Sequence, residues 1–298
     1  MEQVLTLIAN PATADLSAEL ADAAAKALSN QGATLGETDW LAPGVACDVP
    51  FAAPISEDRH QAVRAALSEA PIDLAIQPRE GRRKALLIAD MDSTIVTSET
   101  LDDLADAVGL RERIAPITAR TMAGELDFAQ SLRERVAMLA GLPLTALEAA
   151  RDAVELTPGA RTLVQTMKAQ GTYTALVSGG FTHFTGYVRE RCGFDEDQAN
   201  RFEWVDGQLS GAVVEPILDR DAKLEMLERL CREKALAPAA ACTVGDGAND
   251  IAMLQAAGLG VAFHGKPAAR AATPFRVDHG DLTALLYLQG YRHADFVT

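Results

Sequence analysis

The chain has 298 residues, of which 48% are hydrophobic and 23% are charged, so it is long enough for two domains and has the composition of a globular protein. The formal net charge is −15, and residues 1–80 alone carry 12 Asp and Glu against 4 Lys and Arg, a difference of −8. A surface this acidic repels phosphate backbones and anionic lipids, which argues against nucleic acid and membrane surfaces as partners. It leaves room for a small anionic substrate, provided that the binding site supplies local cations.

The cysteines and the N-terminus indicate a cytoplasmic protein. The four cysteines are widely spaced and form no C-x-x-C pair, which argues against a zinc site or a disulfide framework (Cys47, Cys192, Cys231, Cys242). The opening "MEQVLTLIAN" lacks the basic region of a signal peptide. No apolar stretch approaches the roughly 18 residues that a membrane-spanning helix needs.

Residues 1–80 are expected to form a separate ferredoxin-like unit. "VLTLIA" is typical of a strand and "SAELADAAAKALSNQG" of a helix capped by Ser17. "ATLGETDWLA" and "VACDVPFAA" predict two strands around Pro43-Gly44, followed by a helix in "SEDRHQAVRAALSE" and a strand in "IDLAIQ". The order βαββαβ is the ferredoxin-like pattern. The polar, basic segment "PREGRRK" at 78–84 has the composition of a linker.

From Ala85 onward the pattern predicts an α/β fold with a parallel sheet. Three apolar runs end in small or acidic residues, namely "ALLIAD", "YTALVSGG" and "ACTVGDG", and helical segments separate them. A mostly helical insertion occupies residues from about 100 to 160. "RFEWVDGQLSGAVV" predicts a hairpin that turns at Asp206-Gly207, and "GLGVAF" and "PFRVD" extend the sheet.

Polar groups stand at the carboxyl ends of these strands, where open α/β sheets place their function. Asp90 and Asp92 follow the first strand, and their side chains point the same way in extended chain, so their charges repel unless a cation intervenes. Asp90, Asp246 and Asp250 together would make an all-oxygen site that suits Mg²⁺. One of the first two carboxylates could then attack as a nucleophile while the other serves as acid and base.

Phosphate-binding groups accompany the acids. The Ser178 hydroxyl and the amides of Gly179 and Gly180 can donate to phosphate oxygens, and Lys223 can supply positive charge. Each motif taken singly is more often a turn, a strand exit or a solvated lysine. Their occurrence together, in this order and at successive strand ends, favours phosphoryl transfer.

These motifs resemble the phosphoserine phosphatases of the haloacid dehalogenase superfamily. The resemblance covers residues from about 85 to 280 and rests on Lys223 and on "DMDSTIVTSE", "VSGGF", "GDGAND" and "MAGELDFAQSLRERV". It implies a Rossmann-like parallel-sheet core over residues 81–298, with a helical cap inserted after the first strand at about 100–160.

The resemblance also implies a role for each matched residue. Asp90 would be the nucleophile, and Asp92 would be the acid and base, with its backbone carbonyl on the metal. The metal set would be Asp90, Asp92, Asp246 and Asp250. Glu99 would hold the substrate's amino group and Arg135 its carboxylate. The remaining substrate contacts would come from Met122, Phe128, Ser178, Gly179, Gly180, Lys223 and Asn249.

The N-terminal unit resembles, by element order alone, the small ACT-like regulatory domains found before the catalytic part in many bacterial phosphoserine phosphatases. After its first strand it reads "NPATADLS", which lacks the glycine-bearing ligand loop of a binding ACT domain. A structural or dimerising role is therefore as well supported as serine sensing. A homodimer and serine as a feedback ligand are further expectations.

The predicted function is Mg²⁺-dependent hydrolysis of O-phosphoserine through an aspartyl phosphate, as the last step of serine biosynthesis. A phosphotransferase that passes the phosphoryl group to a hydroxyl such as that of homoserine would use the same residues for its first half-reaction. An amino-acid sensor with a vestigial catalytic fold is the alternative from another class. The presence of Asp90, Asp92, Lys223 and Asp246 argues against it.

Overall fold

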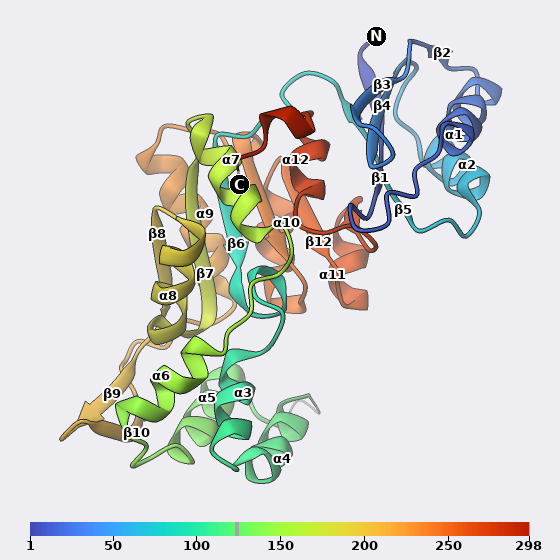
Figure 1. Ribbon diagram of the computed structural model, residues 1–298. Helices are drawn as coiled ribbons and strands as arrows, with labels where there is room; N and C mark the ends of the chain where they lie inside the picture. Colours follow the sequence, from blue (N-terminus) through green and yellow to red (C-terminus); the bar gives the residue numbers. More distant parts are fainter. Residues whose placement is uncertain (123–124, 298) are drawn as a thin grey trace.

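The computed structural model describes residues 1–122 and 125–297, with the backbone alone for Thr121 and Met122. The strands of these residues form an N-terminal antiparallel sheet, a larger parallel sheet and a two-stranded hairpin. In Figure 1 the N-terminal sheet is blue and lies beside the parallel sheet, while the helices of the insertion lie at the far end of the molecule.

The N-terminal sheet has the strand order β2-β4-β1-β5, with β3 also paired to β4. Its elements are β1 (Gln3–Ala9), α1 (Ala18–Asn30), β2 (Thr34–Leu35), β3 (Asp39–Ala42), β4 (Ala46–Ala52), α2 (Glu57–Leu67) and β5 (Ile72–Pro78). The first and last strands are neighbours, as in a ferredoxin-like βαββαβ unit. The hydroxyls of Ser17 and Ser56 accept hydrogen bonds from the first turns of α1 and α2, and the cap at Ser17 is the one predicted from the sequence.

The strand predicted over residues 33–42 is divided into β2 and β3. β2 ends at Leu35, which pairs with Phe51, and β3 resumes at Asp39, which pairs with Asp48. Pro50 stands between those partners on β4, and it has no N–H to donate to a neighbouring strand. Only its carbonyl is used, by the amide of Gly36. The missing donor explains the break.

The larger sheet is parallel throughout, with the order β13-β12-β11-β6-β7-β8. Its strands are β6 (Leu86–Asp90), β7 (Tyr173–Phe181), β8 (Glu196–Asn200), β11 (Ala241–Gly245), β12 (Leu259–Phe263) and β13 (Phe275–Val277). The sequence predicts all of them except β8. β8 reads "EDQAN" and lies at the edge of the sheet, so it lacks the apolar run that marks the buried strands.

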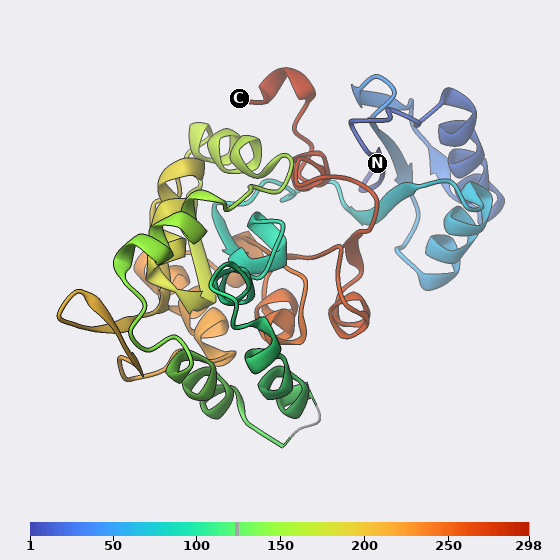
Figure 2. The same cartoon turned by 60° about the horizontal axis from the view of Figure 1, so that its bottom comes forward.

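Helices pack on both faces of this sheet, and the insertion forms a cap over its carboxyl edge (Figures 1 and 2). The core helices are α7 (Ala160–Ala169), α8 (Thr182–Cys192), α9 (Asp221–Glu233), α10 (Ile251–Ala256), α11 (Pro267–Ala272) and α12 (Ala284–Leu288). The cap helices are α3 (Thr100–Ala107), α4 (Arg111–Met122), α5 (Phe128–Ala137) and α6 (Leu144–Asp152).

The predicted hairpin joins the cap. It consists of β9 (Phe202–Val205) and β10 (Gln208–Val213), with the turn residues Asp206 and Gly207 both at positive φ. The amide of Gly141 donates to the carbonyl of Leu209, which ties the hairpin to the chain between α5 and α6.

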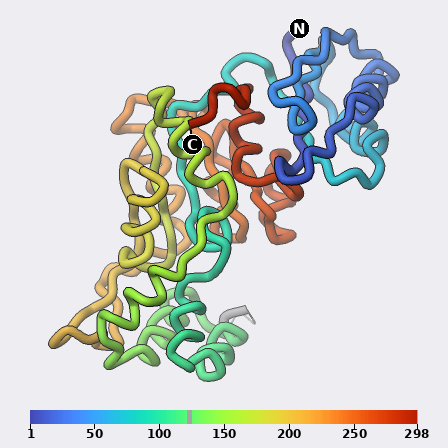
Figure 3. The backbone as a smooth tube through the Cα atoms, viewed as in Figure 1, coloured from blue at the N-terminus to red at the C-terminus, as the bar shows by residue number. Residues whose placement is uncertain are grey.

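Most of the segment predicted to be a linker is exposed, but it contains one buried residue, Arg82. Arg82 is only 8% exposed, and its guanidinium pairs with Asp48 of β4 and donates to the carbonyls of Tyr287 and Leu288. In Figure 3 the red segment that includes residues 284–288 lies between the N-terminal sheet and the parallel sheet. The carboxylate of Asp48 neutralises the buried charge, and the backbone carbonyls accept further N–H groups of the guanidinium. The two sheets are therefore held together by a buried polar contact.

Candidate active site

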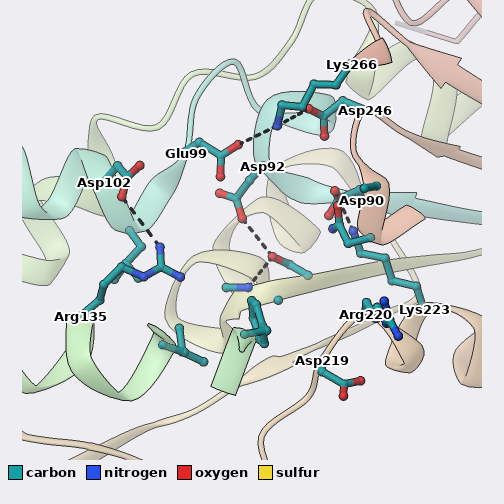
Figure 4. Close-up of a pocket in the computed structure, with 18 of the residues that line it drawn as sticks. Asp90, Asp92, Glu99, Asp102, Arg135, Asp219, Arg220, Lys223, Asp246 and Lys266 are labelled. Carbon is teal, nitrogen blue, oxygen red and sulfur yellow. Dashed lines mark hydrogen bonds and ion pairs between the residues drawn. The ribbon is translucent and has the colours of Figure 1, made fainter. Parts of the chain in front are cut away.

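A cavity of about 700 Å³ lies between the carboxyl ends of β6, β7 and β11 and the cap helices α3 and α5 (Figure 4). Its position is the one expected for a ligand site in an open parallel sheet. It is lined by Asp90, Asp92, Glu99, Leu101, Asp102, Asp127, Phe128, Leu132, Arg135, Ser178, Gly179, Gly180, Asp219, Arg220, Lys223, Asp246, Ala248, Asn249 and Lys266.

Asp90 ends β6 and is held on both carboxylate oxygens. Oδ1 accepts the amide of Met91 at 2.8 Å, and Oδ2 lies 2.7 Å from Nζ of Lys223. Burial raises the pKa of Asp90 well above its ordinary value, the charge of Asp250 raises it further, and Lys223 opposes both. The sequence predicts repulsion between carboxylates at Asp90, and the structure contains it, but the charge of Asp250 contributes more to this repulsion than that of Asp92 does.

Asp92 points to a different set of partners. Its Oδ1 accepts the first amide of α3, that of Thr100, at 2.8 Å, and its Oδ2 accepts the hydroxyl of Ser178 at 3.0 Å. Burial, followed by the charge of Glu99, raises the pKa of Asp92 to about 6. A carboxyl group that titrates near neutral pH can both give and take a proton during turnover. The tight turn that follows, with Ser93 at φ 54°, brings Glu99 back toward this group.

The raised pKa of Asp92 predicts how stability depends on pH. Between pH 4 and 6 the unfolded chain loses this proton while the folded protein keeps it, so folding becomes less favourable as the pH rises. A shift from 3.8 to about 6 corresponds to about 3 kcal/mol. From pH 4.5 to 7.5 the free energy of unfolding of Asp92→Asn should therefore rise by about 2 kcal/mol relative to that of the wild type, measured by urea unfolding without divalent ions. A difference that stays constant with pH would contradict this.

Lys223 is buried between two acids. It lies in the first turn of α9, is 2% exposed, and places Nζ 2.7 Å from Asp90 and 2.5 Å from Asp250. Burial lowers its pKa, but the two carboxylates outweigh that effect and raise it above the ordinary value. Taken alone, Lys223 would be interpreted as a solvated lysine, and that interpretation is wrong. Lys223 is a fixed positive charge that lines the cavity.

Three carboxylates could hold a metal ion. Asp90, Asp246 and Asp250 each offer an oxygen, and these oxygens lie within 4.8 Å of one another. Burial raises the pKa of Asp246, and a bond from Lys266 partly offsets the rise. Asp250 is fully buried behind Lys223 and does not line the cavity. Asp92 contributes no carboxylate to this group, and its implied metal contact through the backbone carbonyl stays a prediction.

Ser178, Gly179 and Gly180 lie near the end of β7, just before its last residue, Phe181. The hydroxyl of Ser178 donates to Asp92 and accepts the amide of Gly180 at 2.8 Å. A Cβ on Gly180 would lie 3.0 Å from that hydroxyl and 3.1 Å from Asp92, and a Cβ on Gly179 would lie 3.1 Å from the ring of Phe128. Both glycines thus keep the backbone close to the cavity, and Phe128 of the cap packs directly over this strand end.

Glu99 and Arg135 approach the cavity from the cap (Figure 4). Glu99 immediately precedes α3 and accepts the hydroxyl of Ser93 at 2.8 Å. Arg135 lies on α5 with its side chain 17% exposed, and its nearest acid is Asp102, at 4.0 Å. The buried Nε of Arg135 has no hydrogen-bond partner among the described residues. The pair therefore presents one anion and one cation to the same space.

The remaining predicted residues fall in two groups. Phe128 and Asn249 line the cavity as the resemblance implies. The side chain of Met122 lies outside the described part of the chain.

The cavity also contains charged residues that the sequence analysis did not identify. Asp102 stands three residues after Glu99 on α3, so helical spacing could have placed both on one face. Lys266 lies just before α11, and its Nζ is 3.0 Å from Asp246 and 4.0 Å from Glu99. Asp219 and Arg220 line the cavity beside α9. Single charged residues in loops show no periodicity, so no sequence pattern identifies Lys266, Asp219 or Arg220 as site residues.

Within the described ranges 1–122 and 125–297, none of the helices combines the length and the apolar character needed to cross a membrane.

Comparison with known proteins gives consistent matches. Residues 87–255 match the profile of a family described as haloacid dehalogenase-like hydrolase. The chain is 39% identical over 293 residues to a phosphoserine phosphatase of Streptomyces coelicolor, covering 96% of this chain and 70% of that protein. It is 40% identical over 203 residues to a phosphoserine phosphatase of Lactococcus lactis, covering 68% of this chain and 94% of that protein.

A solved structure extends the similarity to the whole chain. The probable phosphoserine phosphatase of Vibrio cholerae, in unliganded form, superposes with a TM-score of 0.80 at 29% sequence identity. The alignment covers 99% of this chain and 88% of that one, so the N-terminal sheet is included.

Proposed function

The chain belongs to the haloacid dehalogenase-like hydrolases, and we propose that it is a phosphoserine phosphatase that works through an aspartyl phosphate on Asp90. The observation that carries the proposal is the cavity itself. It joins a buried carboxylate paired with Lys223, a second carboxyl group with a pKa of about 6, and an acid and an arginine on the cap.

The two aspartates divide the chemistry. A carboxylate oxygen of Asp90 attacks phosphorus, and the serine oxygen leaves with the proton of Asp92. Asp92 then takes a proton from a water molecule, and that water attacks the phosphorus of the aspartyl phosphate, which releases phosphate and restores Asp90. Oδ2 of Asp92 already contacts Ser178 at the end of β7, so the proton carrier stands beside the proposed phosphate-binding strand end.

Lys223, Ser178 and the amides of Gly179 and Gly180 would bind the phosphate. Lys223 also lowers the pKa of Asp90 in opposition to burial, which favours the ionised form that a nucleophilic carboxylate requires. Glu99 and Arg135 would pair with the ammonium and carboxylate groups of the serine part, because each offers the complementary charge. Phe128 would cover the bound substrate and exclude water.

The donor set fits Mg²⁺. Three carboxylates converge in a buried place, where burial raises the pKa of Asp90 and of Asp246, and a divalent cation would favour the charged forms of these groups. Asp90, Asp246 and Asp250 would hold the ion, and a bound Mg²⁺ supplies positive charge opposite the transferring phosphoryl group.

Metal dependence gives a direct test. Chelation should abolish phosphate release and added Mg²⁺ should restore it. Ca²⁺ should restore little, because the larger ion takes more ligands at longer distances. Mg²⁺ should also raise the unfolding temperature of the wild type but not of Asp246→Asn. Full activity in excess chelator would contradict the proposed site.

The substrate assignment is tested by phosphate release from a panel of phosphomonoesters. We expect O-phosphoserine to have a kcat/KM well above those of O-phosphothreonine, glycerol phosphate and p-nitrophenyl phosphate. Adding homoserine to the phosphoserine assay distinguishes hydrolysis from transfer, because transfer would give phosphohomoserine in place of inorganic phosphate. No turnover of any ester by the folded, Mg²⁺-loaded protein would favour a sensor.

Three further points stay proposals. They are a role as the last step of serine biosynthesis, a cytoplasmic location, and an ACT-like, dimer-forming N-terminal domain with serine as its ligand. The antiparallel sheet order supports only the ACT-like arrangement of strands, and the domain boundary near residue 80 is proposed on the same basis.

A further inference from the structure

Asp73 connects the N-terminal sheet to the parallel-sheet part of the chain. It lies on β5, is 4% exposed, and its carboxylate accepts three consecutive backbone amides from the segment after β13. Oδ1 accepts the amide of Asp278 at 2.8 Å, Oδ2 accepts that of Gly280 at 2.7 Å, and His279 lies 3.2 Å from both oxygens. A buried carboxylate bound in this way fixes the backbone of residues 278–280.

The fixed segment contacts the loop after β12. The carbonyl of Gly280 accepts a hydrogen bond from Nε2 of His264 at 2.9 Å, which assigns the proton of that ring to Nε2. The amide of His264 donates to the carbonyl of Val277 at 2.7 Å. His264 has φ 43°, a conformation that a non-glycine residue holds only when its surroundings impose it. The side chain of His264 is therefore held by the segment that Asp73 fixes, and its backbone amide is held by Val277, the residue just before that segment.

The same loop reaches the active site two residues later. The amide of Lys266 donates to the carbonyl of Asp246 at 2.8 Å, and its Nζ lies 3.0 Å from the carboxylate of Asp246. Figure 4 shows Lys266 between Asp246 and Glu99 at the side of the cavity. The orientation of one proposed metal-binding carboxylate thus depends on where this loop is held.

We propose that Asp73 is a positioning residue for the active site, acting from the N-terminal sheet through residues 278–280 and His264 on Lys266 and Asp246. The N-terminal sheet would then not only pack against the parallel-sheet part of the chain. It would also set the geometry of the proposed metal site. This inference rests on the proposed function only in taking Asp246 as a metal ligand.

The test is Asp73→Asn in the full-length protein. An amide keeps the size of the carboxylate but replaces one acceptor oxygen with an NH₂ group that faces backbone N–H groups. We expect Mg²⁺ binding, measured by titration calorimetry without substrate, to weaken about 3- to 30-fold, and kcat/KM for O-phosphoserine to fall by a similar factor.

A matched control distinguishes a role in positioning the metal site from a role in holding the N-terminal sheet against the rest of the chain. Asp39→Asn breaks the ion pair between Asp39 of β3 and Arg292, which also joins the two parts of the chain but does not contact residues 278–280. This variant should bind Mg²⁺ and turn over substrate as the wild type does. If Asp73→Asn lowers only the unfolding temperature and leaves Mg²⁺ affinity unchanged well below it, Asp73 is structural and the inference is wrong.

A second variant tests the path and covers the case in which Asp73→Asn fails to fold. His264→Ala leaves the Asp73 contacts intact and removes the next step, so it should weaken Mg²⁺ binding to a similar degree. In the double variant the losses should not add, because both changes interrupt one path. Wild-type Mg²⁺ affinity in His264→Ala would overturn the proposal. A wild-type protein that binds Mg²⁺ but hydrolyses no phosphoserine would instead contradict the proposed function alone.

Discussion

Asp90→Asn is expected to fold normally and to lose turnover by at least about 10³-fold, because an amide cannot form the acyl phosphate. The fold should survive because Lys223 keeps its contact with Asp250, so no buried charge is left without a partner. The change also removes one of the negative charges that crowd this site. Phosphate release and the urea midpoint, measured on the same preparation, give the two results.

A chemical trap identifies the intermediate. Wild-type protein quenched during turnover of radiolabelled phosphoserine should carry phosphate that hydroxylamine removes, and Asp90→Asn should carry none. Asp22→Asn, at an exposed position on α1, makes the same chemical change away from the cavity and should behave as the wild type. Substantial activity in well-folded Asp90→Asn would rule out the covalent mechanism.

Most of the fold follows from the apolar runs and their separators. Central strands such as β6 and β11 are buried on both faces, so they appear in the sequence as continuous apolar segments. β8 and the division between β2 and β3 escape prediction for different reasons. β8 is a polar edge strand, and the division depends on a proline in a neighbouring strand, which a local pattern does not report.

The site follows from the sequence where its residues stand at strand ends. Asp90, Ser178 and Asp246 are placed by the topology alone, because parallel strands end at one edge. The partners of these residues are less predictable. Lys223 contacts both Asp90 and Asp250, and Asp92 binds the first amide of α3. These contacts depend on packing between separate elements, which a local sequence pattern does not report. Lys266 and Arg82 show the same limit, because neither a single lysine nor a short basic run indicates which groups its side chains will contact.

Substrate selectivity is expected to depend on Arg135. Arg135→Ala should cost about 2–5 kcal/mol of transition-state stabilisation toward O-phosphoserine, the range for losing a desolvated charge contact. Activity toward p-nitrophenyl phosphate, which has no carboxylate, should fall far less. Arg135→Lys should recover only part of the loss, because an ammonium cannot reproduce the two parallel hydrogen bonds of a guanidinium. Comparing kcat/KM for the two substrates gives the result.

The structure supplies a matched control for this prediction. Arg133 lies two residues earlier on α5, is 52% exposed and pairs with Glu215, so Arg133→Ala removes the same charge from the same helix outside the cavity. Loss of Arg135 leaves Asp102 half exposed to water, where its charge costs little, so the measured change reports on the substrate. If Arg135→Ala lowers both activities equally, Arg135 serves phosphate binding or folding, and the choice of phosphoserine rests on similarity to relatives alone.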